Sequence, residues 1–268
     1  MHRQHARRGF ERDSQDRELT APRLLRSQDR QSDARVGLSS QTSWPRVLAP
    51  NPAFALALQG MPLPLFGPDL ESRVRDHLAA HERLSVPLDG RRHAAVAVTL
   101  VADADHAPCF LLTRRAPRLT SHAGQWALPG GRVEAGESAI DGALRELAEE
   151  VGLIAAPSQV LGCLDDYPTR SGYVITPVVV WASDSADLVP DPQEVAAIHR
   201  VPLTVLEHPD APHLRQIPES DRPVISIPLL GTFIHAPTAA VLYQLREVAV
   251  WGRPTRVSQF EQPVFAWR

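Results

Sequence analysis

The sequence predicts an α/β protein, because apolar runs of strand length and amphipathic helical segments occur in one chain. Residues 93–101 (HAAVAVTLV) and 109–113 (CFLLT) are apolar and flank turn residues 103–108, so we expect a β-hairpin. Residues 138–152 carry apolar side chains at helical spacing between two helix-end signals. With 43% hydrophobic residues, the chain can bury one sizeable core or two small ones.

The elements before this central helix are expected in the order helix, hairpin and short strand. Residues 69–81 form the first predicted helix, and residues 114–125 form an Arg-rich connection after the hairpin. A short apolar run, 126–128 (WAL), ends at residues 129–131 (PGG). Pro and paired Gly indicate a loop with a special backbone conformation.

The central helix has clear end signals. Ser138 followed by Asp141 resembles a capping box, and Gly152 is typical of the position just past a helix C-terminus. Gly142 lies in the interior, where glycine costs roughly 0.5–1 kcal/mol relative to Ala. It falls on the carboxylate side of the helix, so a ligand and a tight packing contact are both open explanations.

Three strands and a helix are expected in the second half of the chain. Residues 159–165, 173–181 and 197–205 are predicted to be strands or strand–turn segments. Residues 238–250 carry apolar side chains at helical spacing and predict a terminal helix in the core. The tail, residues 252–268, is aromatic but irregular, and the sequence assigns it no role.

The N-terminal part differs in composition from the rest. Residues 1–45 are rich in Arg, Gln, Ser and Asp with almost no apolar periodicity, so they cannot bury enough surface to offset their chain entropy. We therefore expect residues 1–60 to be a disordered extension and residues 61–268 to form a single domain. Met61 is the only methionine besides Met1, so we consider it an alternative start of translation.

Several classes of protein are disfavoured. No run of 18 apolar residues is present, so we expect no membrane span. The N-terminus lacks the apolar core of a signal peptide, and its acidic residues disfavour a transit peptide. Cys109 and Cys163 match no metal-ligand spacing, so we expect buried thiols in a reducing compartment. A cytoplasmic protein is the resulting expectation.

The charge distribution disfavours a nucleic-acid partner. All 28 basic residues are arginine, which, with 25 prolines, we interpret as a bias toward GC-rich codons. Residues 1–50 contain ten arginines and six acidic residues, whereas the remainder contains 18 arginines and 25 acidic residues. The predicted folded part is therefore acidic, which is unfavourable for general nucleic-acid binding.

The central helix carries a concentrated carboxylate patch. At about 100° per residue, Glu146, Glu149 and Glu150 fall within one narrow arc, and the apolar side chains fall on another face. Like charges three and four residues apart destabilise a helix by roughly 0.2–0.5 kcal/mol per pair. A divalent cation would offset this repulsion, and Mg²⁺ or Mn²⁺ prefers oxygen ligands of this kind.

The same stretch resembles the signature of the Nudix hydrolase family, G-x5-E-x7-R-E-U-x-E-E-x-G-U, in which U is aliphatic. All defined positions match: Gly131, Glu137, Arg145, Glu146, Leu147, Glu149, Glu150, Gly152 and Leu153. The resemblance implies a Nudix fold, a mixed β-sheet sandwiched between α-helices, in which the signature forms a loop–helix–loop. It also implies hydrolysis of a diphosphate linkage with Mg²⁺ or Mn²⁺.

This resemblance assigns roles to residues of the signature. In Nudix enzymes, the residues corresponding to Glu146, Glu149 and Glu150 hold the metal ions, and in some enzymes one of them serves as base. Glu137 and Arg145 are expected behind these ligands, where they orient the carboxylates. For Arg145, a structural salt bridge and a direct substrate contact are both open. We count all five residues as candidate catalytic residues.

A second resemblance lies upstream, to the coenzyme A (CoA) pyrophosphatase subfamily, whose signature is LLTxR[SA]xxxRxxxGxxxFPGG. Residues 111–116 (LLTRRA), Gly124 and residues 129–131 match it. Two positions depart, because Thr120 replaces an arginine and Leu128 replaces a phenylalanine. Enzymes of this subfamily cut CoA into 3′,5′-ADP and 4′-phosphopantetheine. Segments downstream, 169–179 and 192–195, are also similar to this subfamily.

Candidate substrate contacts come from the same region. We predict them at Arg115, Arg118, Gly130 and Gly131. The planar guanidinium of Arg115 suits phosphate oxygens, and Arg118 is the candidate replacement for the missing charge at position 120.

Two further residues have either a catalytic or a structural interpretation. Glu194 is a candidate acid or metal-linked base from outside the signature, with a structural role as the alternative. His122 is a candidate acid–base group, with a loop hydrogen bond as the alternative.

The leading hypothesis is a monomeric or homodimeric enzyme that hydrolyses a small-molecule nucleotide, CoA or acyl-CoA. One alternative is a Nudix enzyme for ADP-ribose or a (deoxy)nucleoside triphosphate, which the departures at Thr120 and Leu128 favour. Another is a non-catalytic nucleotide-binding module. Loss of signature carboxylates would be typical of such a module, and none is lost.

Overall fold

The computed structural model describes residues 63–117, 124–183 and 187–267, which all lie in one compact unit, Ser43–Arg268. The boundary predicted at residue 60 and the alternative start at Met61 lie outside the described residues and stay predictions. Within the described part, no helix has the length and apolar character that crossing a membrane requires. The helices are α2 (Pro68–Ala80), α3 (Ala139–Val151) and α4 (Thr238–Gln244), which continues as a π-helix (Leu245–Val250).

Strands form two sheets. The main sheet contains β1 (Arg92–Ala102), β2 (Pro108–Arg115), β3 (Trp126–Ala127), β4 (Gly130–Arg132), β5 (Val160–Cys163), β6 (Tyr167–Pro168), β7 (Tyr173–Trp181) and β8 (Val195–Pro202). The second, antiparallel sheet contains β9 (His213–Ile217), β10 (Ser220–Leu229) and β11 (Thr232–His235). Short 3-10 helices are Pro157–Gln159, Leu203–Glu207 and Val264–Trp267.

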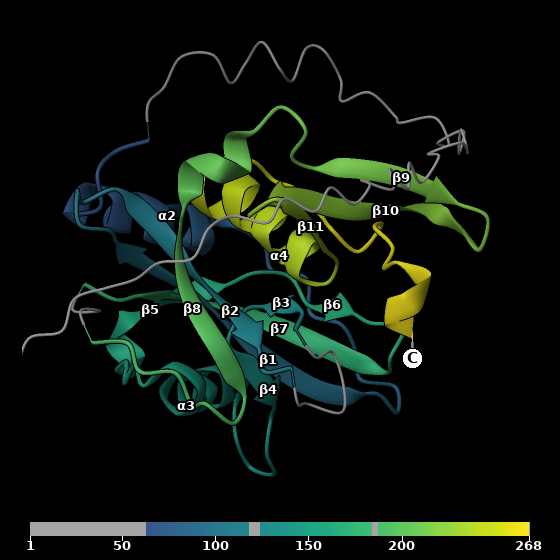
Figure 1. The fold of residues 1–268 in the computed structure, drawn as a ribbon, viewed down its shortest axis with the longest axis horizontal. Coiled ribbons are helices and arrows are strands. Elements are labelled where there is room, and N and C mark those ends of the chain that lie inside the picture. The colour runs from purple at the N-terminus through teal and green to yellow at the C-terminus, as the bar shows by residue number, and fades with distance from the viewer. Residues whose placement is uncertain (1–62, 118–123, 184–186, 268) are drawn as a thin grey trace, which may run out of the picture. The chain divides into compact units, whose positions relative to one another are not determined.

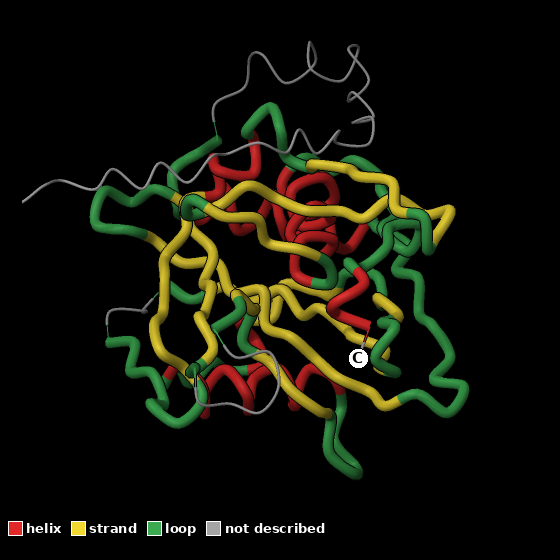
Figure 2. The backbone as a smooth tube through the Cα atoms, turned by 45° about the vertical axis from the view of Figure 1, so that its right-hand side comes forward, coloured by secondary structure: helices red, strands yellow, loops and turns green. Residues whose placement is uncertain are grey.

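The main sheet is mixed, because β1 pairs in parallel with β7 and antiparallel with β2 and β4. At the sheet margins, β5 and β6 pair antiparallel with β7, and β8 pairs antiparallel with β2. In Figure 1, α3 lies on one face of this sheet, and α2, α4 and the second sheet lie on the other. Figure 2 shows the same layers after rotation. The predicted α/β class, a mixed sheet between helices, is confirmed.

Each face of the main sheet has its own hydrophobic core. Along β1, Ala95 and Ala97 pack against α3, whereas Val98 and Leu100 pack in the core that contains α2 and α4. Successive strand side chains point to opposite faces, so a strand buried on both faces needs an almost continuous apolar sequence. This explains the almost continuous apolar run at 93–101, in which Thr99 is the one polar residue after His93.

The predicted hairpin of β1 and β2 is confirmed, but the two strands pair only near their turn, residues 100–102 with 108–110. Beyond that point they diverge, and the segment 126–132 enters between them, with β3 on β2 and β4 on β1. Between β3 and β4, the Pro129 carbonyl accepts a hydrogen bond from the Ala97 N–H (2.8 Å). The divergence therefore brings the paired glycines alongside β1, under α3.

The predicted end signals of α3 are confirmed. The Ser138 hydroxyl accepts a hydrogen bond from the Asp141 N–H (3.1 Å), and the Asp141 carboxylate accepts one from the Ser138 N–H (3.3 Å). Gly152 ends the helix in the left-handed conformation, with φ of 71°. Gly142 is buried, and a Cβ added there would lie 3.1 Å from the Glu137 Oε2 atom. Tight packing, and not an opening for a ligand, therefore explains this glycine.

Two predicted segments are confirmed with a change of geometry along them. Residues 197–205, predicted as a strand or strand–turn segment, are a strand up to Pro202 and then a 3-10 helix. Residues 238–250 are helical, as predicted, but the α-helix widens into a π-helix after Gln244, which apolar periodicity alone does not indicate. One prediction needs correction. Cys109 is buried, as expected, but Cys163 is only half-buried. The second sheet was not predicted at all.

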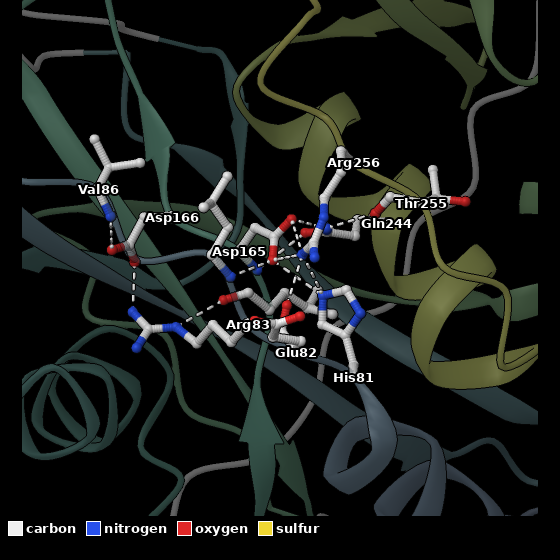
Figure 3. Close-up of polar contacts among 11 residues, drawn as sticks. His81, Glu82, Arg83, Val86, Asp165, Asp166, Gln244, Thr255 and Arg256 are labelled. Atoms are coloured by element: carbon white, nitrogen blue, oxygen red, sulfur yellow. Dashed lines mark hydrogen bonds and ion pairs between the residues drawn. The ribbon is translucent and has the colours of Figure 1, made fainter.

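A buried polar network joins α2 to the C-terminal segment (Figure 3). The Asp165 carboxylate accepts hydrogen bonds from Gln244 Nε2 (2.8 Å) and Arg256 Nη1 (2.8 Å), and it lies 3.0 Å from His81 Nε2. Burial alone would raise the pKa of Asp165, but these hydrogen bonds and one from the Leu84 N–H outweigh it and lower the pKa. The network stabilises the core on the α2 side of the sheet.

The tail, to which the sequence assigned no role, contributes a second buried carboxylate. Glu261 is 1% exposed and accepts hydrogen bonds from Arg170 (2.6 Å), Arg222 (2.7 Å) and the Ser220 hydroxyl (2.9 Å). Burial would raise the pKa of Glu261, but these hydrogen bonds and one from the Gln262 N–H lower it to about 2. The tail thereby connects β10 to the loop before β7.

We expect Glu261→Gln to lower the free energy of unfolding at pH 7 by about 2 kcal/mol. This figure is smaller than the pKa shift alone would give, because solvent screens the partly exposed Arg170 and Arg222. The folded-state pKa of about 2 lies below the ordinary 4.5, so this stabilisation is present above pH 4.5 and is lost as pH falls toward 2. Denaturant unfolding of both proteins from pH 7 to 3 should show the difference narrowing. Glu219→Gln, at an exposed turn position, is the control. A difference that is constant with pH would contradict the assignment.

Candidate active site

Two carboxylates of α3 face the glycines of β4. The Glu150 side chain is 4% exposed, and its Oε2 atom accepts a hydrogen bond from the Gly130 N–H (3.3 Å). Its Oε1 atom lies 3.8 Å from Arg115 Nη1, too far for a good hydrogen bond. The Glu146 side chain is 14% exposed and lies against Gly131. The structure thus brings together two predicted metal ligands and three predicted substrate-binding residues.

The two glycines are required for different physical reasons. A Cβ on Gly130 would lie 2.4 Å from the Ala95 carbonyl oxygen, so this glycine permits close packing of β4 on the backbone of β1. A Cβ on Gly131 would lie 2.2 Å from Glu146 Oε1, so this glycine leaves room for the carboxylate. Gly130 is therefore required for the packing of the sheet, and Gly131 is required for the position of Glu146 in the site.

Arg145 holds the other carboxylates of the signature. Its Nε atom donates to Glu137 Oε1, and its Nη1 atom donates to Glu146 Oε1 and Glu149 Oε2, all at 2.9 Å. Its Nη2 atom donates to the Arg132 carbonyl (2.9 Å). The hydrogen bond from Arg145 is the main cause that lowers the pKa of Glu137. Arg145 and Glu137 thus lie where they can orient Glu146 and Glu149, and their catalytic roles stay predictions.

The surroundings of Glu150 and Glu146 raise the pKa of both carboxyl groups. Burial raises the pKa of Glu150 to about 7, with Arg115 opposing the shift and Glu146 and Glu194 adding to it. Burial also raises the pKa of Glu146, although Arg145 opposes this. A carboxyl group with a pKa near neutrality exchanges its proton at physiological pH, which is typical of functional sites.

Arg115 has an unused donor. Its side chain extends from the end of β2, where a bulge places it opposite Val195 of β8. Its Nε atom is buried and has no hydrogen-bond partner in the part of the chain that the structure describes. A buried donor without a partner is costly, so an anionic ligand at this position would be stabilised.

The donor set fits a divalent cation. Among residues 63–117, 124–183 and 187–267, no three His, Cys, Asp or Glu side chains form a ready-made metal site. Arg145 contacts only one carboxylate oxygen of Glu146 and one of Glu149, and their other oxygens have no partner in these ranges. Together with Glu150, they offer the oxygen ligands that Mg²⁺ and Mn²⁺ prefer.

The remaining candidate residues have different outcomes. Glu194 is exposed, and its backbone carbonyl accepts a hydrogen bond from the Ala116 N–H (2.7 Å), which keeps it beside the end of β2. It lies close enough to raise the pKa of both Glu146 and Glu150. Arg118 and His122 lie outside the described residues. The Arg132 carbonyl was missed, because a backbone acceptor leaves no side-chain signal in a sequence.

Comparisons with known proteins agree with the predicted Nudix resemblance over part of the chain. Residues 91–220 match the family model described as NUDIX domain. Two curated relatives are called uncharacterized Nudix hydrolase NudL. The chain is similar to the one from Photorhabdus laumondii (43% identical over 117 residues; 43% of this chain and 62% of the relative). It is also similar to the one from Yersinia enterocolitica (40% identical over 112 residues; 41% and 56%). The matches thus span less than two thirds of either relative.

Solved structures are also similar. One is a Nudix hydrolase from M. smegmatis, RenU, which is 24% identical, with 59% of this chain and 86% of that chain covered and a TM-score of 0.40.

We expect substitution of Gly130 to affect mainly stability and substitution of Gly131 to affect mainly metal binding. In Gly130→Ala the new methyl group meets backbone, so we expect the free energy of unfolding to fall by roughly 2–4 kcal/mol. In Gly131→Ala it meets the end of a flexible side chain, so we expect a small loss of stability but at least tenfold weaker Mn²⁺ binding as Glu146 is displaced. Thermal unfolding and calorimetry measure the two effects.

Gly67→Ala is the matched control for both variants, because a Cβ there meets nothing within 4 Å. Equal stability losses in the Gly130 and Gly131 variants, or unchanged Mn²⁺ binding in Gly131→Ala, would contradict the two roles.

Proposed function

We propose that the Nudix domain of this chain, residues 91–220, hydrolyses a diphosphate linkage in a nucleotide derivative. Nudix hydrolases generally use divalent metal ions, and here Glu146, Glu149 and Glu150 would hold Mg²⁺ or Mn²⁺. The observation that carries this proposal is the contact region of Glu150 and Arg115, where a buried carboxylate lies 3.8 Å from a guanidinium with an unused donor. A cation site and an anion site thus adjoin.

The side chains support this chemistry in distinct ways. Arg115 would bind a phosphate oxygen through its unused Nε donor. Arg145 orients Glu146 and Glu149. The bound metal would neutralise charge on the diphosphate and activate a water molecule. Glu150 would accept a proton from the attacking water as the water oxygen bonds to phosphorus and the bridging P–O bond breaks.

CoA or acyl-CoA is the substrate that we propose, with 3′,5′-ADP and (acyl-)4′-phosphopantetheine as products. The support is the upstream signature, because its arginine, Arg115, lies beside Glu150. Of the two departures from that signature, Leu128 is 4% exposed in the core, so it changes packing and not a surface contact. Thr120 lies outside the described residues.

A panel of CoA, acetyl-CoA, ADP-ribose, NADH and deoxynucleoside triphosphates with Mg²⁺ or Mn²⁺ tests the substrate. Selective release of 3′,5′-ADP from CoA, detected by chromatography, would support the proposal. Preferential hydrolysis of ADP-ribose or a nucleoside triphosphate would replace CoA with that substrate. Absence of product from every diphosphate would favour the nucleotide-binding module.

We expect Glu150→Gln to fold normally yet lose at least 100-fold in kcat on the preferred substrate, because the amide neither holds a metal as a carboxylate does nor accepts the proton. The control is Glu134→Gln, an exposed position of the same signature. Circular dichroism and steady-state kinetics measure fold and turnover. Turnover by Glu150→Gln within a few-fold of the wild type would refute the role.

Metal affinity should depend on pH through Glu150. Its pKa of about 7 lies above the ordinary value of 4.5, so the carboxyl group keeps its proton up to about pH 7, and a metal ion must displace it. We expect Mn²⁺ to bind about tenfold more weakly at pH 6 than at pH 8. Calorimetry across this range should show the change in the wild type and a smaller one in Glu150→Gln. An affinity independent of pH would exclude Glu150 as a ligand.

A further inference from the structure

The segment that leads into β8 binds the last turn of α3. The Val189 N–H donates to the Val151 carbonyl, and the Asp191 N–H donates to the Glu150 carbonyl, both at 3.0 Å. In Figure 1, this segment passes beside α3 before β8 begins. The last carbonyls of a helix have no partner within the helix, so the two N–H groups satisfy acceptors that would otherwise need water. The helix end that carries Glu150 is therefore held by a segment outside the signature.

A tight turn begins at Asp191, directly after this contact. The Asp191 carbonyl accepts hydrogen bonds from the N–H groups of Glu194 (3.1 Å) and Val195 (2.8 Å). The Asp191 Oδ1 atom accepts one from the Gln193 N–H (2.8 Å). An Asp side chain that binds the N–H two residues later stabilises a turn, and Pro192 at the next position is also favourable for turns. The Asp191 carboxylate therefore helps to fix the conformation of this turn.

The turn ends beside Arg115. The Glu194 carbonyl accepts a hydrogen bond from the Ala116 N–H (2.7 Å), and Val195 pairs with Arg115 across β8 and β2. The backbone at the end of β2, from which the Arg115 side chain extends, is thus held by the last residues of the same turn.

One turn therefore connects the backbones of two residues whose side chains meet in the candidate active site. Glu150 is held where the turn begins and Arg115 where it ends, and Glu150 Oε1 lies 3.8 Å from Arg115 Nη1. The two residues come from a helix and a strand in different layers, so their separation depends on contacts that join these layers. Within residues 63–117, 124–183 and 187–267, the half-buried Asp191 carboxylate binds only the Gln193 N–H. Any effect of this carboxylate on the site must therefore pass through the backbone.

We propose that Asp191 is a positioning residue, which sets the separation of Glu150 and Arg115 through the turn that it stabilises. The inference rests on the proposed hydrolase function and adds a residue from outside the signature to the same site. A displacement of about 1 Å at reacting groups can cost about 100-fold in rate. A turn that fixes two side chains from different layers can therefore control metal and phosphate binding without contacting either ligand.

The test compares Asp191→Ala with Asp191→Asn. The alanine variant loses the acceptor for the Gln193 N–H, so we expect about tenfold weaker Mn²⁺ binding by calorimetry and an about tenfold higher KM for the preferred substrate. The asparagine variant keeps an oxygen acceptor, so both values should return to within about twofold of the wild type. A purely structural role would lower the melting temperature and the amount of Mn²⁺ bound, but not the affinity of the folded molecules. An unchanged Mn²⁺ affinity in Asp191→Ala would overturn the inference.

Asp103→Ala is the matched control. The Asp103 Oδ1 atom accepts hydrogen bonds from the N–H groups of Asp105 (2.9 Å) and Ala107 (2.8 Å) in the turn between β1 and β2, so this variant loses the same kind of acceptor. It should keep the Mn²⁺ affinity of the wild type, and a loss equal to that of Asp191→Ala would overturn the inference.

Asp191→Ser replaces Asp191→Ala if the alanine variant does not fold. A serine hydroxyl makes the same turn hydrogen bond more weakly, so we expect about threefold weaker Mn²⁺ binding. Wild-type affinity in Asp191→Ser would then overturn the inference.

The Mn²⁺ measurements need no turnover, so they separate this inference from the proposed function. If no diphosphate is hydrolysed and Mn²⁺ still binds more weakly to Asp191→Ala than to Asp191→Asn, the positioning role stands and the hydrolase proposal fails. If a diphosphate is hydrolysed and both variants bind Mn²⁺ equally, the positioning role fails and the hydrolase proposal stands.

Discussion

The close contact between the glycines of β4 and the carboxylates of α3 is the constraint on which the rest of the site depends. It requires β1 and β2 to diverge so that β4 can enter beside β1, and it requires small residues on both sides of that contact. Gly130 lies on the Ala95 backbone, and Gly131 lies against Glu146. A single methyl group at either position would exceed the space available, so the sheet geometry and the carboxylate positions are coupled.

Buried carboxylates in this protein have opposite titration behaviour for one physical reason, the number of donors they meet. Glu261 and Asp165 each accept several hydrogen bonds, which outweigh the cost of burial and lower their pKa values. Glu150 has one long hydrogen bond and a guanidinium at 3.8 Å, so burial dominates and the pKa rises to about 7. Glu261 and Asp165 stabilise the fold, whereas Glu150 can still bind a metal ion or a proton.

Arginine, the only basic residue besides histidine in this chain, serves three separate purposes. Arg145 arranges carboxylates, Arg115 keeps a buried donor for an anion, and Arg170 with Arg222 neutralises the buried Glu261. The planar guanidinium allows all three, because its several N–H groups can bind one partner and leave others available. In the candidate site, Arg115 and Arg145 therefore lie against the carboxylates of α3.

The sequence by itself determined the central helix, its capping residues and the spacing of its carboxylates, because these depend on contacts between residues three or four positions apart. It also determined the hairpin and the class of the fold. Only the tertiary structure decided that Glu150 is buried while Glu149 is exposed, and that Arg132 meets Tyr173, 41 positions away. Strand neighbours and burial arise from non-local packing, which has no fixed period in a sequence. For the same reason the second sheet and the role of Glu261 became visible only in the folded chain.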